Sequence, residues 1–203
     1  ASSEVPSAFF KTVDLSPIDP GSFTIKARGP QARVAVIAKP RFTQWDEAIV
    51  NVLDGVLIPP SNSVMIAVIN RFSGVHAKPK VGFLGDWGEW DGAFATTISH
   101  DSHNLTVFGS DVDQMAIAAN ALIAAGGGMA VVHKCRVIAI LPLPVAGLVS
   151  TAPLREVAAN FAAVRRAMDQ VVTWQPPYLT FKALVGATLA CNIGPHQTDL
   201  GIA

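Results

Sequence analysis

Hydrophobic residues up to about residue 71 come in short runs that are rich in β-branched side chains and are separated by proline and glycine. Runs of this length and composition are typical of β-strands. The spacing of three and four residues that marks an amphipathic helix is absent from this part of the sequence. The pattern predicts strands over residues 23–27, 32–38, 47–52 and 64–69, a turn at 59–62, and a further strand over 81–84 after a loop.

Helical spacing begins only in the second half of the chain. Apolar residues recur every three or four positions between Ser110-Asp111, a pair that can cap a helix, and Gly126-Gly127-Gly128, which can end one. A second apolar stripe follows Pro153 and covers 154–172. The other predicted elements are a hairpin of 129–133 with 136–141, an ordered and buried loop over 142–148, a helix over 178–186 and a turn over 191–195.

The order of these elements, strands first and then helices mixed with hairpins, predicts an α+β fold with mixed or antiparallel sheets and a few packed helices. A TIM barrel is excluded because it needs eight alternating strands and helices. The 203 residues are enough for one large domain, which we place over 1–203. A possible subdivision lies near 72–92, between a β-rich part, 1–71, and an α+β part, 92–203.

The composition points away from nucleic acids and membranes as partners. Fifteen basic residues balance fifteen acidic ones, and no run of Lys or Arg occurs. The chain therefore lacks the basic footprint of a protein that binds nucleic acid or an anionic membrane surface. Hydrophobic residues make up 50% of the chain and charged residues only 15%. This core-rich composition favours a large buried interface, and hence a homo- or hetero-oligomer.

A cytoplasmic location is expected. The sequence shows neither a signal peptide nor an apolar stretch near the roughly 20 residues of a membrane helix. Its two cysteines, Cys135 and Cys191, are too far apart to suggest a disulfide framework. Their apolar surroundings predict two buried small side chains in a reducing compartment.

The densest group of polar side chains is Ser99-His100-Asp101-Ser102-His103-Asn104, which follows an apolar, β-rich stretch over 92–98. In a strand, the even-numbered members of this run would face one way and the odd-numbered members the other. At a strand end the alternation relaxes, and the side chains from His100 to Asn104 could line the mouth of a pocket, where catalytic groups usually lie. The alternative is an ordinary turn, in which Asp, Ser and Asn bond to their own main chain.

A metal site on this run is the weaker interpretation. His100 and His103 lack the helical i, i+4 spacing of a His-Glu-x-x-His motif, and no third or fourth ligand lies nearby in the sequence. Two tryptophans in the glycine- and acid-rich loop 85–92 also invite interpretation. Trp87 and Trp90 would either stack on a planar ligand or partner chain, or cap the local core.

The sequence resembles a known family over nearly its whole length. The block from Gly92 to Leu105, which contains the His-Asp-Ser-His-Asn run, resembles the C-terminal region of bacterial adenine deaminases, members of the amidohydrolase superfamily. Further blocks at 113–121, 126–129 and 141–148 resemble the same region in the same order and spacing, and 190–195 and 198–201 also fit.

The resemblance implies part of a hydrolase of purine metabolism that converts adenine and water to hypoxanthine and ammonia. In the family a metal-activated hydroxide attacks the substrate, and a TIM barrel that precedes this region holds the divalent metal, expected as Mn, Fe or Zn. This chain would accompany such a barrel, as a region or a separate subunit, close over its active site and be inactive alone. The implied catalytic residues are Asp101, His103 and His100, the implied contacts to an adenine-like substrate are Ser102 and Asn104, and no metal ligand is assigned to this chain.

Three departures from the family leave the substrate open. The hairpin that usually turns through Asp-Gly has His133-Lys134-Cys135-Arg136 here, and Ser150-Thr151 replaces a usual Ser-Asp. The loop at Gly85-Asp86 also lacks a basic residue that is common nearby in the family. A relative that hydrolyses another cyclic amidine or amide would look much the same. A non-catalytic binding or scaffold module that kept the fold is a further alternative, and a free-standing metal hydrolase that uses His100 and His103 is the weakest one.

Overall fold

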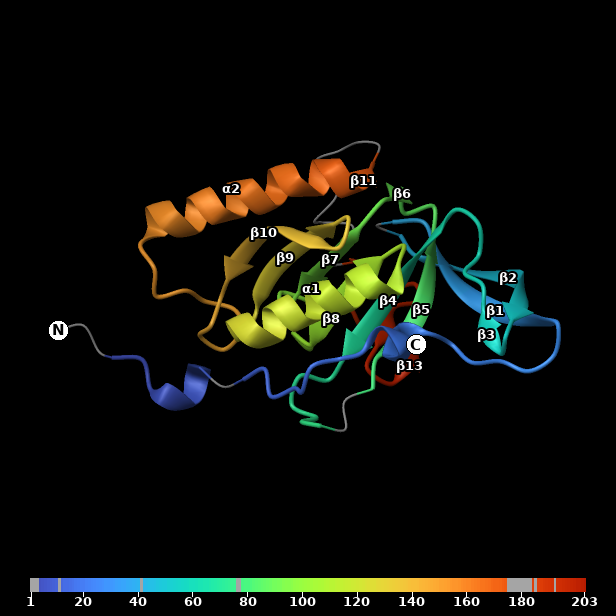
Figure 1. The fold of residues 1–203 in the computed structure, drawn as a ribbon, viewed down its shortest axis with the longest axis horizontal. Coiled ribbons are helices and arrows are strands. Elements are labelled where there is room, and N and C mark those ends of the chain that lie inside the picture. Colours follow the sequence, from blue (N-terminus) through green and yellow to red (C-terminus); the bar gives the residue numbers. More distant parts are fainter. Residues whose placement is uncertain are drawn as a thin grey trace.

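The computed structural model describes residues 4–10, 12–40, 42–75, 78–174, 184, 186–191 and 193–203. A nine-stranded sheet in the order β10-β9-β7-β8-β4-β5-β1-β2-β3 forms its centre. Figure 1 shows helix α1 (Val112–Ala125) in front of this sheet and helix α2 (Leu154–Val171) along its upper side. The strands of the sheet are β1 (Gln31–Ala38), β2 (Gln44–Leu53), β3 (Val56–Leu57), β4 (Ser63–Ile69), β5 (Lys80–Gly85), β7 (Ala93–Thr96), β8 (Leu105–Gly109), β9 (Gly128–His133) and β10 (Arg136–Pro142). The other described elements are the strand pairs β6 (Glu89–Trp90) with β11 (Val172–Thr173) and β12 (Gln197–Thr198) with β13 (Gly201–Ile202), and the 3-10 helices η1 (Ser7–Phe10) and η2 (Pro20–Phe23).

Side chains of the central strands alternate between two hydrophobic clusters, one on each face of the sheet. In β4, Ile66 belongs to the cluster that contains Met168 of α2, whereas Ala67 belongs to the cluster that contains Met115 of α1. Successive strand residues point to opposite faces, so each helix covers its own face. Because both faces are covered, the sequences of β4, β7, β8 and β9 are nearly continuous buried runs.

The predicted α+β fold is confirmed, and most predicted elements occur in place. The predicted strands at 32–38, 47–52, 64–69 and 81–84 correspond to β1, β2, β4 and β5, and the predicted hairpin to β9 and β10. Helix α1 begins as the sequence indicated, since the side chain of Asp111 accepts a hydrogen bond from the Gln114 main-chain N–H at 2.9 Å. It ends at Gly126, whose φ of 76° is readily available to glycine.

The prediction of a strand over 23–27 is wrong. Pro20 begins the 3-10 helix η2 instead, and Phe23 at its end is fully buried. Only Lys26 then makes an isolated β-bridge, with Val56. The helix predicted over 178–186 lies almost entirely outside the described residues, and Asn192 in the turn predicted at 191–195 lies outside them as well.

The prediction that both cysteines are buried is also wrong, because Cys135 and Cys191 are exposed free thiols. Cys135 follows Lys134 in the tight turn between β9 and β10, where the two residues have φ angles of 57° and 50°. Positive φ at both central positions is the mark of a type I′ hairpin turn, which places both side chains outside the sheet.

The strand registers bring three loops to one end of the sheet. Ile69 pairs with Leu105, and Thr96 pairs with both Thr106 and Met129, so the ends of β4 and β7 align with the starts of β8 and β9. The end of β10 lies there too, because Pro142 pairs with Gly128. Loops 70–74, 97–104 and 142–148 therefore emerge together, and we call this end of the sheet the 97–104 end.

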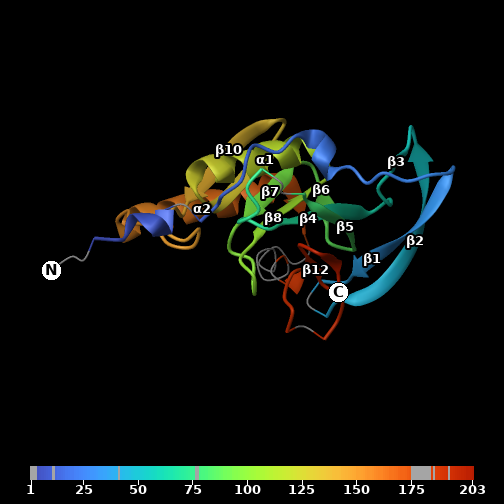
Figure 2. The ribbon, with the colours of Figure 1, turned by 90° about the horizontal axis from the view of Figure 1, so that it is seen from below.

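The other side of the molecule is formed by a strand arm. Strands β1, β2 and β3 extend away from the two helices (Figure 2). Pairing of β4 with β8 joins strands from both sides of residues 72–92 in the one sheet, and β5, which lies within that segment, pairs with β1 and β4. No helix among the described residues is long and apolar enough to cross a membrane.

Candidate functional site

The run from Ser99 to Asn104 lies in the loop between β7 and β8. The main-chain N–H of His103 donates to the Ser99 carbonyl at 2.7 Å, so the run is a tight turn and not a strand. This turn brings the rings of His100 and His103 into edge contact, with 4.9 Å between their centroids. The solvent-exposed members of the run are His100, Asp101 and Ser102, whereas His103 is half-buried and Asn104 is buried.

A chain of buried hydroxyl groups supports the turn from below. Thr106 donates to Ser99 Oγ at 2.8 Å, and Ser99 Oγ lies 2.8 Å from Thr188 Oγ1. Thr188 in turn donates to the His100 carbonyl at 3.0 Å. If Ser99 donates to Thr188, every hydroxyl donates once, and the base of the turn is fully hydrogen-bonded.

Thr97 fixes the start of the loop to its neighbours. Its fully buried hydroxyl accepts from the Gly128 main-chain N–H at 2.8 Å and donates to the Gly147 carbonyl at 2.5 Å. Its own N–H donates to the Gly128 carbonyl at 3.0 Å. The 97–104 loop is therefore held against loop 142–148, and its exposed side chains project from a rigid base.

The structure adds Arg71, a residue that the sequence analysis did not single out. Arg71 follows β4, and its main-chain N–H donates to Asn104 Oδ1 at 3.4 Å. Arg71 is only 8% exposed. Its side chain donates from Nη1 to the Ala146 carbonyl at 2.7 Å and lies over the Phe72 ring with 5.0 Å to the centroid. The signal in the sequence was a single arginine two residues after the apolar run 64–69. Burial lowers the pKa of Arg71 from its ordinary value.

The electrostatic surroundings keep His103 neutral near pH 7. Its pKa is lowered from the ordinary 6.5 first by burial, then by the nearby His100 and Arg71, while a main-chain contact with Thr97 and the carboxylate of Asp101 act in the opposite direction. Its Nδ1 is buried and has no hydrogen-bond partner among the described residues. A neutral imidazole beside an exposed carboxylate can hold or move a proton, which is the chemistry of general acid–base catalysis.

The same geometry does not suit a metal ion. Within the described part of the chain, no group of three or more His, Cys, Asp or Glu side chains could hold one. His100 and His103 contact one another ring to edge, and a metal site needs further ligands that converge on one point.

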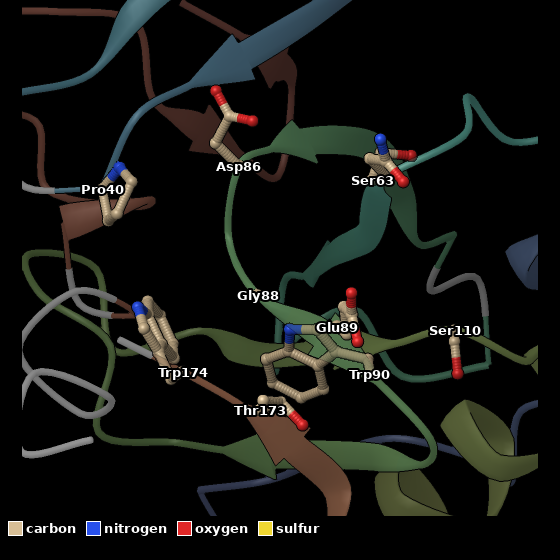
Figure 3. Close-up of a pocket in the computed structure, with 10 residues that line it drawn as sticks. Pro40, Ser63, Asp86, Gly88, Glu89, Trp90, Ser110, Thr173 and Trp174 are labelled. Atoms are coloured by element: carbon tan, nitrogen blue, oxygen red, sulfur yellow. The ribbon is translucent and has the colours of Figure 1, made fainter. Parts of the chain in front are cut away.

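The two tryptophans of loop 85–92 have different environments. Trp87 is fully buried and belongs to the core cluster under α2, which agrees with the core interpretation. Trp90 is half-buried, stacks on Phe108 with 6.2 Å between ring centroids, and lines an open cavity of about 740 Å³ together with Trp174. Figure 3 shows both indoles in this cavity, with the carboxylate of Asp86 on its far side. The cavity also includes Ser63 and Ser110, so it lies at the end of the sheet opposite the 97–104 end.

Comparison with known proteins shows extensive similarity to one group of enzymes. The family described as adenine deaminase C-terminal domain matches residues 40–203. Adenine deaminase 2 of Rhizobium johnstonii is 57% identical over 192 residues, and adenine deaminase 2 of Rhizobium meliloti is 59% identical over 192 residues, covering 95% of this chain and 32% of each relative. Adenine deaminase of Klebsiella pneumoniae is 44% identical over 194 residues, which cover 94% of this chain and 32% of that relative. The chain therefore spans about a third of the length of the curated relatives that it matches.

Proposed function

This chain belongs to the adenine deaminase C-terminal domain family, and from that membership we propose that it is the C-terminal part or subunit of an adenine deaminase-like hydrolase. In the proposed enzyme, a TIM-barrel catalytic region provides the other two thirds, and this chain closes over its active site with the 97–104 end. The observation that carries the proposal is the exposed turn of His100, Asp101 and Ser102, supported from below by buried hydrogen bonds, in a chain with this family match.

The proposed reaction converts adenine and water to hypoxanthine and ammonia. Water adds to the ring carbon that bears the amino group, the carbon–nitrogen bond breaks, and the departing amine takes up a proton and leaves as ammonia. A divalent metal, proposed as Mn, Fe or Zn, belongs to the catalytic region, because the described residues of this chain do not form a site that fits one. We therefore assign this chain no step that passes through a metal.

Three side chains of the turn are proposed to handle protons and substrate. Asp101 is exposed and forms no ion pair with any described residue, so its carboxylate is free to exchange a proton with the ring or the departing amine. His103 is neutral near pH 7 and lies beside it, and His100 contacts His103. We propose proton-handling roles only for these side chains of the turn, which in the proposed enzyme meets the catalytic region.

The two proposed substrate contacts differ in accessibility. Ser102 is exposed at the turn, where its hydroxyl can orient a purine ring. Asn104 is only 5% exposed, and its Oδ1 accepts from the Arg71 main chain. Its burial favours a role in fixing loop 70–74 against the turn, so in the proposed enzyme Asn104 acts mainly as a positioning residue.

One departure from the family lies far from this turn. Lys134 and Cys135, which replace a usual Asp-Gly pair, join β9 and β10 at the end of the sheet where Val132 pairs with Ala93. The candidate turn follows Thr96 at the opposite end of β7. The hairpin departure is therefore remote from the candidate turn, whereas Ser150-Thr151 follows loop 142–148 at the 97–104 end, so a relative that acts on another cyclic amidine stays the alternative to adenine.

A chimeric enzyme tests the proposal. The C-terminal third of Rhizobium johnstonii adenine deaminase 2 is replaced by this chain, and hypoxanthine formation is compared with that of the parent and of the parent truncated before the same third. We expect the chimera to deaminate adenine and the truncated protein to be inactive. A folded, metal-loaded chimera that leaves adenine unchanged, or a truncated protein as active as the parent, would contradict the proposal and favour a binding module.

A further inference from the structure

Arg71 is a buried cation for which the described structure provides no anion. The described ion pairs are Arg33 with Glu47 and His133 with Asp91, and neither includes Arg71. The side-chain hydrogen bond from Arg71 Nη1 goes to the neutral carbonyl of Ala146 and leaves the charge uncompensated. Its Nε is buried and has no hydrogen-bond partner among the described residues. Buried charges in proteins are normally paired, because leaving them alone is costly.

The guanidinium is nevertheless held in a defined position. The Phe72 ring supports one face and the Ala146 carbonyl fixes Nη1. Gly147 next to it has a φ of 69°, and a Cβ at this position would overlap Nη1, so the loop leaves room for the arginine. With Nη1 occupied, the remaining donors are Nη2 and the buried Nε, which together form the edge on which an arginine binds a carboxylate through two parallel hydrogen bonds. A carboxylate must therefore be inserted into the protein to reach Nε.

No carboxylate among the described residues forms an ion pair with Arg71. His103 lies close enough to Arg71 that the positive charge of the guanidinium helps to lower the pKa of His103. The nearest carboxylate in the turn, Asp101, is exposed and is not paired with Arg71. An anion that approaches the 97–104 end would therefore meet a fixed cation and hydrogen-bond donors.

We infer that Arg71 receives an Asp or Glu side chain of the catalytic region, inserted beside the 97–104 loop. This inference rests on the proposed function, which places a catalytic region over this end of the sheet. Adenine and hypoxanthine carry no anionic group near neutral pH, so the substrate cannot supply the carboxylate. When the catalytic region covers the site, the ion pair of Arg71 and the carboxylate is removed from water. Arginines buried in this way contribute a large share of the binding free energy of an interface.

The inference predicts opposite effects of one substitution in two settings. Arg71→Met keeps much of the side-chain volume and removes the charge. In the isolated chain it removes an unpaired buried cation, so the unfolding midpoint should stay the same or rise. In the chimera it leaves a carboxylate buried without a partner, so the midpoint should fall and deaminase activity should fall with it.

Arg71→Lys and Arg33→Met complete the comparison. Lysine keeps the charge but not the two-pronged geometry, so it should restore part of the chimera's stability. Arg33 lies on the strand arm with a 70% exposed side chain, so Arg33→Met should lower neither midpoint appreciably. A fall of the Arg71→Met midpoint in the isolated chain as large as in the chimera would make Arg71 a local structural residue. An Arg71→Met chimera with an unchanged unfolding midpoint and unchanged deaminase activity would also overturn the inference.

A titration with acetate tests the site without any catalytic region. At constant ionic strength, acetate should shift the Arg71 Nε–H signal in the NMR spectrum of the chain, and chloride should not. The acetate shift measured on neighbouring main-chain N–H signals should be lost in Arg71→Met. Equal responses to acetate and chloride would contradict a carboxylate site, whereas an inactive chimera with a normal acetate response would count against the proposed function alone.

Discussion

The imidazole rings of His100 and His103 meet edge to face, with 4.9 Å between their centroids. Strand alternation would have placed these two residues on opposite faces of a sheet. The hydrogen bond from the His103 main chain to the Ser99 carbonyl, 2.7 Å long, forms the turn that brings them together. The turn leaves Asp101 at its exposed tip, so three groups able to exchange protons are presented on one short loop.

Acidification should destabilise the chain through His103. Its pKa in the folded state is lowered by burial, His100 and Arg71 from the 6.5 expected when unfolded, so below pH 6.5 the unfolded state binds more protons than the folded state. The contribution of His103 to stability is therefore complete above pH 6.5 and is lost as the pH falls from 6.5 toward the lowered pKa. Urea unfolding between pH 7 and 5 should show a smaller loss of stability in His103→Gln than in the wild type. Equal losses would contradict the lowered pKa.

Removing the Thr97 hydroxyl should destabilise the loop base. Thr97→Val keeps the shape but leaves the buried Gly128 N–H and Gly147 carbonyl without this partner. A loss of about 1–3 kcal/mol in the free energy of unfolding is expected. Thr24→Val is the matched control, because the Thr24 hydroxyl donates only to the nearby Gly21 carbonyl at the surface and its loss should cost less than about 0.5 kcal/mol. Similar losses of unfolding free energy in both variants would show that the Thr97 hydroxyl does not hold the 97–104 loop in place.

Gly147→Ala should disturb Arg71 in addition to straining the main chain. Gly147 has a φ of 69°, and the added methyl group would overlap Arg71 Nη1 and contact Thr97. Gly201 is the control, since its φ of 132° is also positive but no atom lies within 4 Å of an added Cβ. Strain in the left-handed region costs about 1–2 kcal/mol, so Gly147→Ala should lose at least that much in urea unfolding. It should also weaken the acetate response, whereas Gly201→Ala should leave that response intact.

Cys135→Gly should stabilise the hairpin of β9 and β10. Lys134 and Cys135 both hold positive φ angles in its type I′ turn, a conformation that glycine adopts without steric cost. The expected gain is about 0.5–1 kcal/mol in the free energy of unfolding, after the greater flexibility of glycine in the unfolded chain is included. Cys191→Gly removes the other exposed thiol and controls for effects of thiol chemistry. A destabilised Cys135→Gly variant would contradict the assigned turn.

Local signals predicted those elements that depend on local structure. Asp111 and Gly126 begin and end α1 by contacts within the helix itself, and the apolar runs of the central strands follow from burial on both faces. The strand predicted over 23–27 failed because Pro20 and the burial of Phe23 outweighed the β-branched pattern. Cys135 was misjudged because its apolar neighbours lie in strands and the residue itself lies in the turn.

Only part of the candidate site could be predicted from the sequence, because the rest depends on long-range contacts. The polar run itself could be read from six consecutive residues, but its shape depends on partners distant in sequence. Thr188 contacts Ser99 across 89 positions, and Arg71 contacts Ala146 across 75. Neither spacing has a sequence signature, so the buried hydroxyl chain and the unpaired arginine emerge only from the folded structure.

The most direct measurement of the proposed function is kcat for adenine in the chimera that carries Asp101→Asn, with Asp46→Asn on the exposed strand arm as the matched control. Loss of a positioned acid–base group should lower turnover by about 10²-fold or more. Because Asp101 is exposed and unpaired among the described residues, the unfolding midpoint of the chain should be nearly unchanged. Normal turnover combined with a large loss of thermal stability would contradict the account and identify the turn as purely structural.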